Sequence, residues 1–135
     1  MRSFIITSTV FASLIMSASA SELATQLMVR DLQRAEQVVA AAESSQDFPE
    51  MKKQADRLLG FAARMPDKED IGTRGACGAA VQSLRNLADD LSEPKSARKI
   101  VSSTRERKTF LEYMPMCEED VGLQPPATPN LRIRN

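Results

Sequence analysis

A repeated spacing of apolar residues along the chain constrains its fold most strongly. Between Ser21 and Ser44, apolar and small side chains recur at alternating intervals of three and four residues: Thr25, Met28, Leu32, Ala35, Val39 and Ala42. Such a series lies along one face of an α-helix, because about 3.6 residues complete one turn. Charged residues fill much of the remainder: Arg30, Asp31, Arg34, Glu36 and Glu43. The spacing therefore predicts an amphipathic helix over residues 21–44.

Three later segments, 48–64, 73–91 and 94–114, show the same kind of pattern. In the first of them the apolar positions are Met51, Ala55, Leu58, Ala62 and Met65, with Leu59 widening the face. In the next they are Cys77, Ala80, Val81, Leu84, Leu87 and Leu91. In the last they are Ala97, Ile100, Val101, Thr104, Leu111 and Met114. No segment sustains the period-two alternation of a half-buried strand, so we expect none.

Capping and proline signals place the ends of these helices. Asp47 is the expected N-cap of the second helix, with Pro49 in its first turn, where a missing N–H costs nothing. Ser92 is the expected cap of the fourth helix, with Pro94 in its first turn. Pro115 is expected to end that helix.

Four amphipathic helices joined by short connections predict an all-α fold, a small antiparallel four-helix bundle. A looser array of helical hairpins is the alternative. Residues 122–135 carry three prolines and few apolar side chains, which favours a disordered C-terminal tail. The other possibility is that this tail docks as an extended peptide, with Arg132 and Arg134 as its anchors.

The N-terminus has the three-part pattern of a secretory signal peptide. Arg2 precedes an apolar stretch over residues 4–16, and Ala18 and Ala20 form an A-x-A cleavage pattern. The stretch is short for a membrane span, which takes about 20 residues, so an uncleaved anchor is the lesser alternative. We expect residues 1–20 to be removed, leaving a bundle domain over 21–121 and a flexible tail over 122–135. The mature protein would be periplasmic or secreted, without stable membrane insertion.

Two cysteines in an exported chain predict one disulfide, between Cys77 and Cys117. Antiparallel packing would bring the start of the third helix beside the end of the fourth, just before Cys117. Small residues around Cys77 would allow the close approach that a disulfide needs: Gly75, Ala76, Gly78 and Ala79. A reactive thiol at a helix N-terminus and an intermolecular disulfide are the competing interpretations.

Composition excludes several classes of chemistry. The chain has no histidine, so Ser–His and Cys–His nucleophile pairs, imidazole zinc sites and histidine-ligated haem are all excluded. Two cysteines cannot supply four thiolates to a metal. A net charge of zero argues against electrostatic binding of nucleic acid. We therefore expect no catalytic residues, cofactor or metal ligands.

Other clusters have plain structural interpretations. Gly72, Gly75 and Gly78 form a G-x-x-G-x-x-G run without the strand that a phosphate-binding loop follows. The acidic run at residues 118–120 and the one at 67–70 supply too few ligands for Ca²⁺ and are expected to be exposed turns. Apolar residues at the end of the fourth helix would close the bundle or form an interaction patch: Phe110, Tyr113, Met114 and Met116.

The fourth helix is the most basic segment. Residues Lys95, Arg98, Lys99, Ser102 and Arg105 share one face at helical spacing. This face is either a solvated bundle surface or a contact for an acidic partner protein, lipid or glycan.

These observations favour an exported, non-enzymatic helical interaction protein of the cell envelope: an accessory, inhibitor or immunity-type binder of another exported protein. A periplasmic holdase chaperone or stress protein is the alternative. An enzyme that uses carboxylates alone, such as a glycan-cleaving one, ranks last, because it needs two acids facing each other across a cleft.

Overall fold

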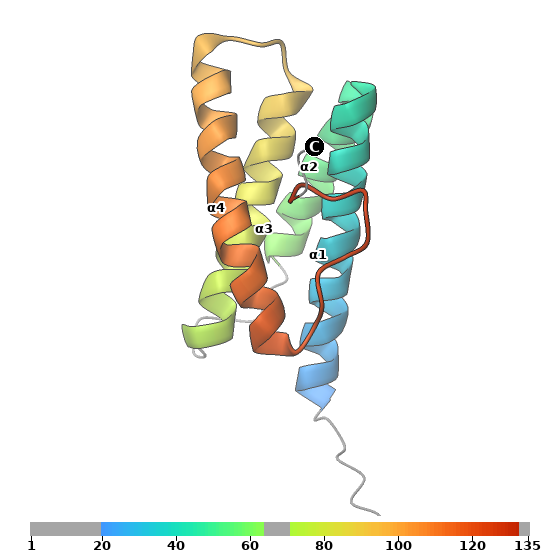
Figure 1. Ribbon diagram of the computed structural model, residues 1–135, viewed down its shortest axis with the longest axis vertical. Helices are drawn as coiled ribbons and strands as arrows, with labels where there is room; N and C mark the ends of the chain where they lie inside the picture. Colours follow the sequence, from blue (N-terminus) through green and yellow to red (C-terminus); the bar gives the residue numbers. More distant parts are fainter. Residues whose placement is uncertain (1–19, 64–70, 133–135) are drawn as a thin grey trace, which may run out of the picture.

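The computed structural model describes residues 20–63 and 71–132, and this part of the chain contains four helices and no strand. They are α1 (Ala20–Ser45), α2 (Phe48–Ala63), α3 (Ile71–Ser92) and α4 (Ala97–Val121). Figure 1 shows them running alternately up and down, side by side. The predicted antiparallel four-helix bundle is confirmed. Nearly all of the predicted signal peptide lies outside the described residues.

The α1–α2 turn and the α3–α4 connection lie at one end of the bundle, called the loop end below (Figure 1). At this end the predicted cap of α2 is confirmed, since the Asp47 carboxylate accepts a hydrogen bond from the Glu50 N–H at 3.1 Å. The predicted cap of α4 is wrong. Ser96 is the cap and accepts from the Lys99 N–H at 3.2 Å. Ser92 instead closes α3, where its hydroxyl donates to the Asp89 carbonyl at 2.7 Å.

Pro115 does not end α4, which continues to Val121. The proline side is exposed, whereas Met114 and Cys117 on the other side are fully buried. Their burial offsets the lost backbone hydrogen bond, a cost of about 3 kcal/mol for a proline inside a helix. The helix ends at Gly122, whose φ of 72° is left-handed and whose N–H donates to the carbonyls at the end of α4.

The core follows most of the predicted apolar faces. It is built from all four helices, with Leu32, Val39, Leu58, Leu84 and Phe110 among its buried members. Two parts of the predicted faces are wrong. Leu59 is 53% exposed, and the apolar residues in the first turns of α4 are also exposed. A single stripe is enough to bury α2, so the flanking leucine remains in solvent.

The disulfide between Cys77 and Cys117 is confirmed, with the two Cα atoms 4.8 Å apart. It joins α3 to α4 at the end of the bundle opposite the loop end, and Cys117 lies inside α4. The role predicted for the glycines is wrong: a β-carbon added at Gly75 or Gly78 would meet nothing within 4 Å. The small residues near Cys77 that are buried in the core are alanines, Ala76 and Ala80.

The C-terminal tail is not disordered over residues 122–132, which corrects the expectation for this segment. It runs back along α1 and then turns across the seam between α1 and α4 (Figure 1). Leu131 is buried in the core, and the Gln37 side chain of α1 donates to the Ala127 carbonyl at 2.8 Å. A proline-rich segment with few apolar residues is held here because polar groups of α1 satisfy its backbone. Within 20–63 and 71–132, no helix is long and apolar enough to cross a membrane.

Candidate functional site

The first half of α4, residues 97–109, contributes no buried side chain to the core. Its apolar residues Ile100 and Val101 are 54% and 70% exposed. The second half is different, because Phe110, Met114 and Cys117 are fully buried there. One stretch of α4 is therefore free to contact something other than this bundle.

A groove opens beside this exposed stretch, between the α1–α2 turn and the α3–α4 connection. We call it the loop-end groove. It has a volume of about 540 Å³. Its apolar lining comes from three helices and the α3–α4 connection: Phe48, Met51, Leu91, Pro94 and Ile100. Its polar lining comes from α1, α3 and α4 as well as from the turn and the connection: Glu43, Gln46, Asp90, Ser92, Glu93, Lys95, Lys99 and Ser103. The arrangement is that of a small apolar site with a polar rim.

The predicted basic face divides into two kinds of residue. Lys99 lies between Asp90 and Glu93, with its Nζ 3.1 Å and 2.9 Å from their carboxylates. The hydrogen bonds that Lys99 donates to Glu93, and then to Asp90, raise the pKa of Lys99 above its usual value. Arg105 contacts Glu106 at 3.0 Å. These two cations are largely neutralised by their neighbours.

Lys95 and Arg98 are exposed, and neither has an ion pair with any residue in the described part of the chain. Because α4 begins at Ala97, Lys95 lies in the connection before it, on the rim of the loop-end groove. The structure therefore places one unpaired positive charge, Lys95, at the edge of the groove, whereas Arg98 is exposed in the first turn of α4 and does not line the groove.

The wall of the groove also contains a carboxylate oxygen without a partner. The side chain of Asp90 is only 10% exposed, and its Oδ1 accepts from Lys99. Its Oδ2 is buried and has no hydrogen bond within the described residues. Leaving a buried acceptor unpaired costs about 1–3 kcal/mol.

A second site, which the sequence analysis did not predict, joins the tail to α1 and α4. The Arg132 guanidinium donates to both oxygens of Glu36, at 3.1 and 2.9 Å, and to both oxygens of Glu118, at 2.5 and 3.0 Å. The two glutamates are 0% and 2% exposed. Desolvation raises the pKa of Glu36 above its usual value, although its hydrogen bonds from Arg132 act in the opposite direction.

This buried cluster corrects two expectations. Glu118 was expected in an exposed acidic turn with Glu119 and Asp120, but it lies in the last turns of α4 and faces inward. Glu36 was assigned to the polar side of its helix. A sequence signal for its burial exists in a second stripe of α1: Val29, Gln33, Glu36 and Ala40 are all buried. Of the two predicted tail anchors, Arg132 is one, and Arg134 lies outside the described residues.

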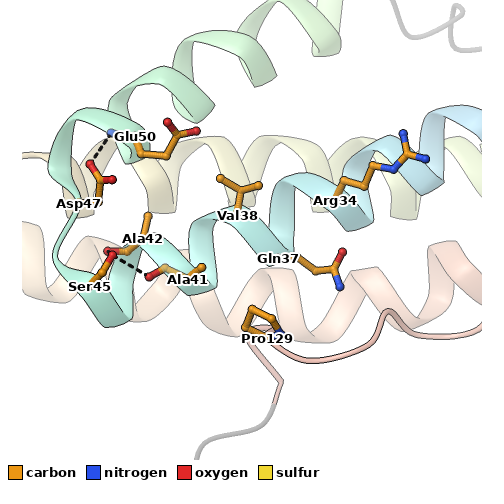
Figure 2. A pocket seen from close by; sticks show the side chains of 9 residues that line it. All are labelled: Arg34, Gln37, Val38, Ala41, Ala42, Ser45, Asp47, Glu50 and Pro129. Carbon is orange, nitrogen blue, oxygen red and sulfur yellow. Dashed lines mark hydrogen bonds between the residues drawn. The ribbon is translucent and has the colours of Figure 1, made fainter.

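The surface of α1 beyond the tail is hollowed on its outer side. Figure 2 shows this hollow of about 590 Å³, with Arg34 and Gln37 at one end and Asp47 and Glu50 at the other. Pro129 of the tail borders it beside Gln37. Val38, Ala41 and Ala42 supply apolar lining between these polar ends.

Both cysteines of the chain are in the disulfide, so the predicted alternatives of a reactive thiol and of an intermolecular bond do not apply. Of the apolar residues at the end of α4, Phe110 and Met114 close the core, and Met116 is half exposed. Within 20–63 and 71–132, no group of three acidic or cysteine side chains is arranged to hold a metal ion. No protein-family model, curated protein or solved structure matches this chain.

Proposed function

We propose that this protein is an exported, non-enzymatic binding protein of the cell envelope, and that its loop-end groove holds an apolar segment of another exported protein. The observation that carries the proposal is the uncovered first half of α4, where Ile100 and Val101 lie in solvent beside the groove. Exposed apolar surface with a polar rim is the usual character of a protein-binding patch.

One cation at the groove, Lys95, has no ion pair within the described residues and favours an acidic residue in the partner segment. Lys99 is not available in the same way, because Asp90 and Glu93 hold it. Cations at the rim increase the rate of encounter and select the partner more than they add affinity.

Export is supported by the predicted signal peptide and by the disulfide, because such bonds persist in oxidising compartments. The holdase alternative would use the same apolar surface, and its distinguishing property is broad, weak binding of unfolded clients.

The experiment is affinity capture of the mature, oxidised protein from its own envelope extract, with two matched pairs of variants. Ile100→Asp places a charge in the groove, and Leu59→Asp places the same charge at an equally exposed leucine, 53% against 54%. Lys95→Glu reverses a rim charge, and Lys53→Glu reverses an exposed charge on α2.

One dominant partner, lost with Ile100→Asp and Lys95→Glu and retained with both controls, is the expected result. A partner retained by all four variants would reject the loop-end groove. Many weak partners together with suppressed aggregation of unfolded clients would favour the holdase.

A further inference from the structure

The seam between α1 and α4 has the features of a peptide-binding groove, with the tail as its occupant. We call it the tail groove, and define it by Gln33, Glu36 and Gln37 of α1 and Glu118 of α4. The Nε2 atoms of Gln33 and Gln37 donate to the carbonyls of Gln124 and Ala127, at 2.7 and 2.8 Å. Every residue has a backbone carbonyl, so these contacts hold an extended segment with little regard to its sequence.

Specific recognition is concentrated in two consecutive residues of the tail. Leu131 is buried in the core, and its N–H donates to Glu36 Oε1 at 3.2 Å. Arg132 then reaches both buried carboxylates through four hydrogen bonds. Asn130 holds the backbone of the tail at Arg132, since its Oδ1 accepts a hydrogen bond from the Arg132 N–H at 3.0 Å.

The tail groove contains more negative charge than the bundle alone can compensate. Glu36 and Glu118 have no ion pair in the described chain other than Arg132. Gln33 also donates to Glu118, at 2.5 Å, but an amide carries no charge. With the tail removed, two buried carboxylates would face each other across the seam without a cation. A planar guanidinium satisfies four oxygens at once, which a lysine ammonium cannot do.

We propose that the tail groove is a binding site for an extended peptide with a leucine followed by an arginine, and that residues 123–132 are its resident ligand, exchangeable for a segment of the same chemistry supplied by another molecule. This site is separate from the loop-end groove and does not rest on the function proposed for it. A tethered ligand competes at an effective concentration of about millimolar, so the intact tail weakens the binding of any outside peptide.

The test uses the full chain with a protease site inserted between Gly122 and Leu123, folded and oxidised before it is cut. A fluorescent peptide of residues 123–135 is then added to the cut and to the uncut protein, and anisotropy is measured. We expect saturable binding to the cut protein and binding at least about tenfold weaker to the uncut protein. Peptides with Arg132→Lys or Leu131→Ala should bind at least about tenfold more weakly than the wild-type peptide. The Gln124→Ala peptide should bind as tightly as the wild-type peptide.

A second measurement keeps the tail attached. The full chain with Arg132→Gln, shown by circular dichroism to be folded, should bind the labelled peptide more tightly than the wild type, because its own tail competes less well. A folded Arg132→Gln chain and a folded cut chain that both fail to bind the peptide would overturn the proposal. So would equal binding of the wild-type and Arg132→Lys peptides, since the site would then not recognise a guanidinium. If the cut protein lost its structure and the added peptide did not restore that structure, exchange would be rejected as well.

Discussion

The two halves of α4 belong to one continuous helix and differ in what covers them. Residues 110–121 are packed against α3, joined to it by the disulfide and covered by the tail on the side of α1. Residues 97–109 have no buried side chain, and they border an open groove. The half that contains Cys117 is closed by covalent, apolar and ionic contacts, whereas the half at the loop end leaves apolar side chains in solvent.

Truncating the closed half should have the largest effect. Phe110→Ala removes a fully buried ring and should lower the free energy of unfolding by about 3–5 kcal/mol. Ile100→Ala, in the open half, should change it by less than about 0.5 kcal/mol. Urea denaturation monitored by circular dichroism measures both. Similar losses for the two variants would show that the halves are equally packed and would break the comparison.

Reduction of the disulfide should have the next largest effect. The bond closes a loop with a separation of 40 residues, and such a bond contributes about 2–4 kcal/mol, mainly by restricting the unfolded chain. The oxidised protein should therefore melt at a higher temperature than protein treated with a thiol reductant. Mass spectrometry should first show that the disulfide has been reduced to two thiols. If the melting curve of that reduced protein is unchanged, the predicted stabilisation is wrong.

The pH dependence of stability should report on the buried carboxylate of Glu36 in α1. Because burial raises the pKa of Glu36, the folded state binds this proton more tightly than the unfolded state does. The stabilisation due to this proton is fully present below the ordinary value of 4.5 and is lost as the pH rises through the raised pKa. Acidification from neutral pH should thus remove part of the cost of burying Glu36.

The measurement compares the wild type with Glu36→Gln, which resembles the protonated side chain, across this range of pH. The free energy of unfolding of the variant should exceed that of the wild type most at neutral pH, and the difference should decrease towards pH 4.5. Glu119 directly follows Glu118 and is exposed, so Glu119→Gln controls for the loss of one negative charge. An advantage that grows on acidification would mean that the pairing with Arg132 outweighs desolvation.

The smallest effects should come from the glycines near Cys77. Since a β-carbon at Gly75 or Gly78 meets nothing within 4 Å, alanine there should raise stability by about 0.5–1 kcal/mol each through its better helix propensity. Gly122→Ala should instead lower it by about 1 kcal/mol, because φ at this residue is 72°. Thermal melting tells the expected gain in stability at Gly75 and Gly78 from the expected loss at Gly122. A loss at Gly75 or Gly78 would restore the tight-packing role that their spacing first suggested.

Local sequence patterns were sufficient for the helices and for the disulfide. The three- and four-residue spacing places Leu32, Val39 and Leu84 in the core, because helical periodicity determines which side chains share a face. The cap at Asp47 depends on residues within one turn, and it was also predictable. The expected end of α4 at Pro115 failed because packing on the opposite face of the helix outweighed a local signal.

The candidate sites were less predictable than the fold. Lys95 and Arg98 could be selected as cations from the sequence, but the neutralisation of Lys99 depends on acids at the end of α3 and in the connection, which a helical wheel of α4 leaves out. The apolar lining of the loop-end groove combines Phe48, Leu91 and Ile100, and each of them was first assigned to a helix considered by itself.

Helical spacing and the cysteine count were enough to predict a bundle of four amphipathic helices and one disulfide. Which polar residues are buried depends on how the helices and the tail pack together. Arg132 lies 96 positions from Glu36, and its charge compensates that carboxylate only after the tail has folded back across the bundle. Spacing within a helix is a local property, whereas the cancellation of buried charge depends on which distant segments meet, and the fold alone brings them together.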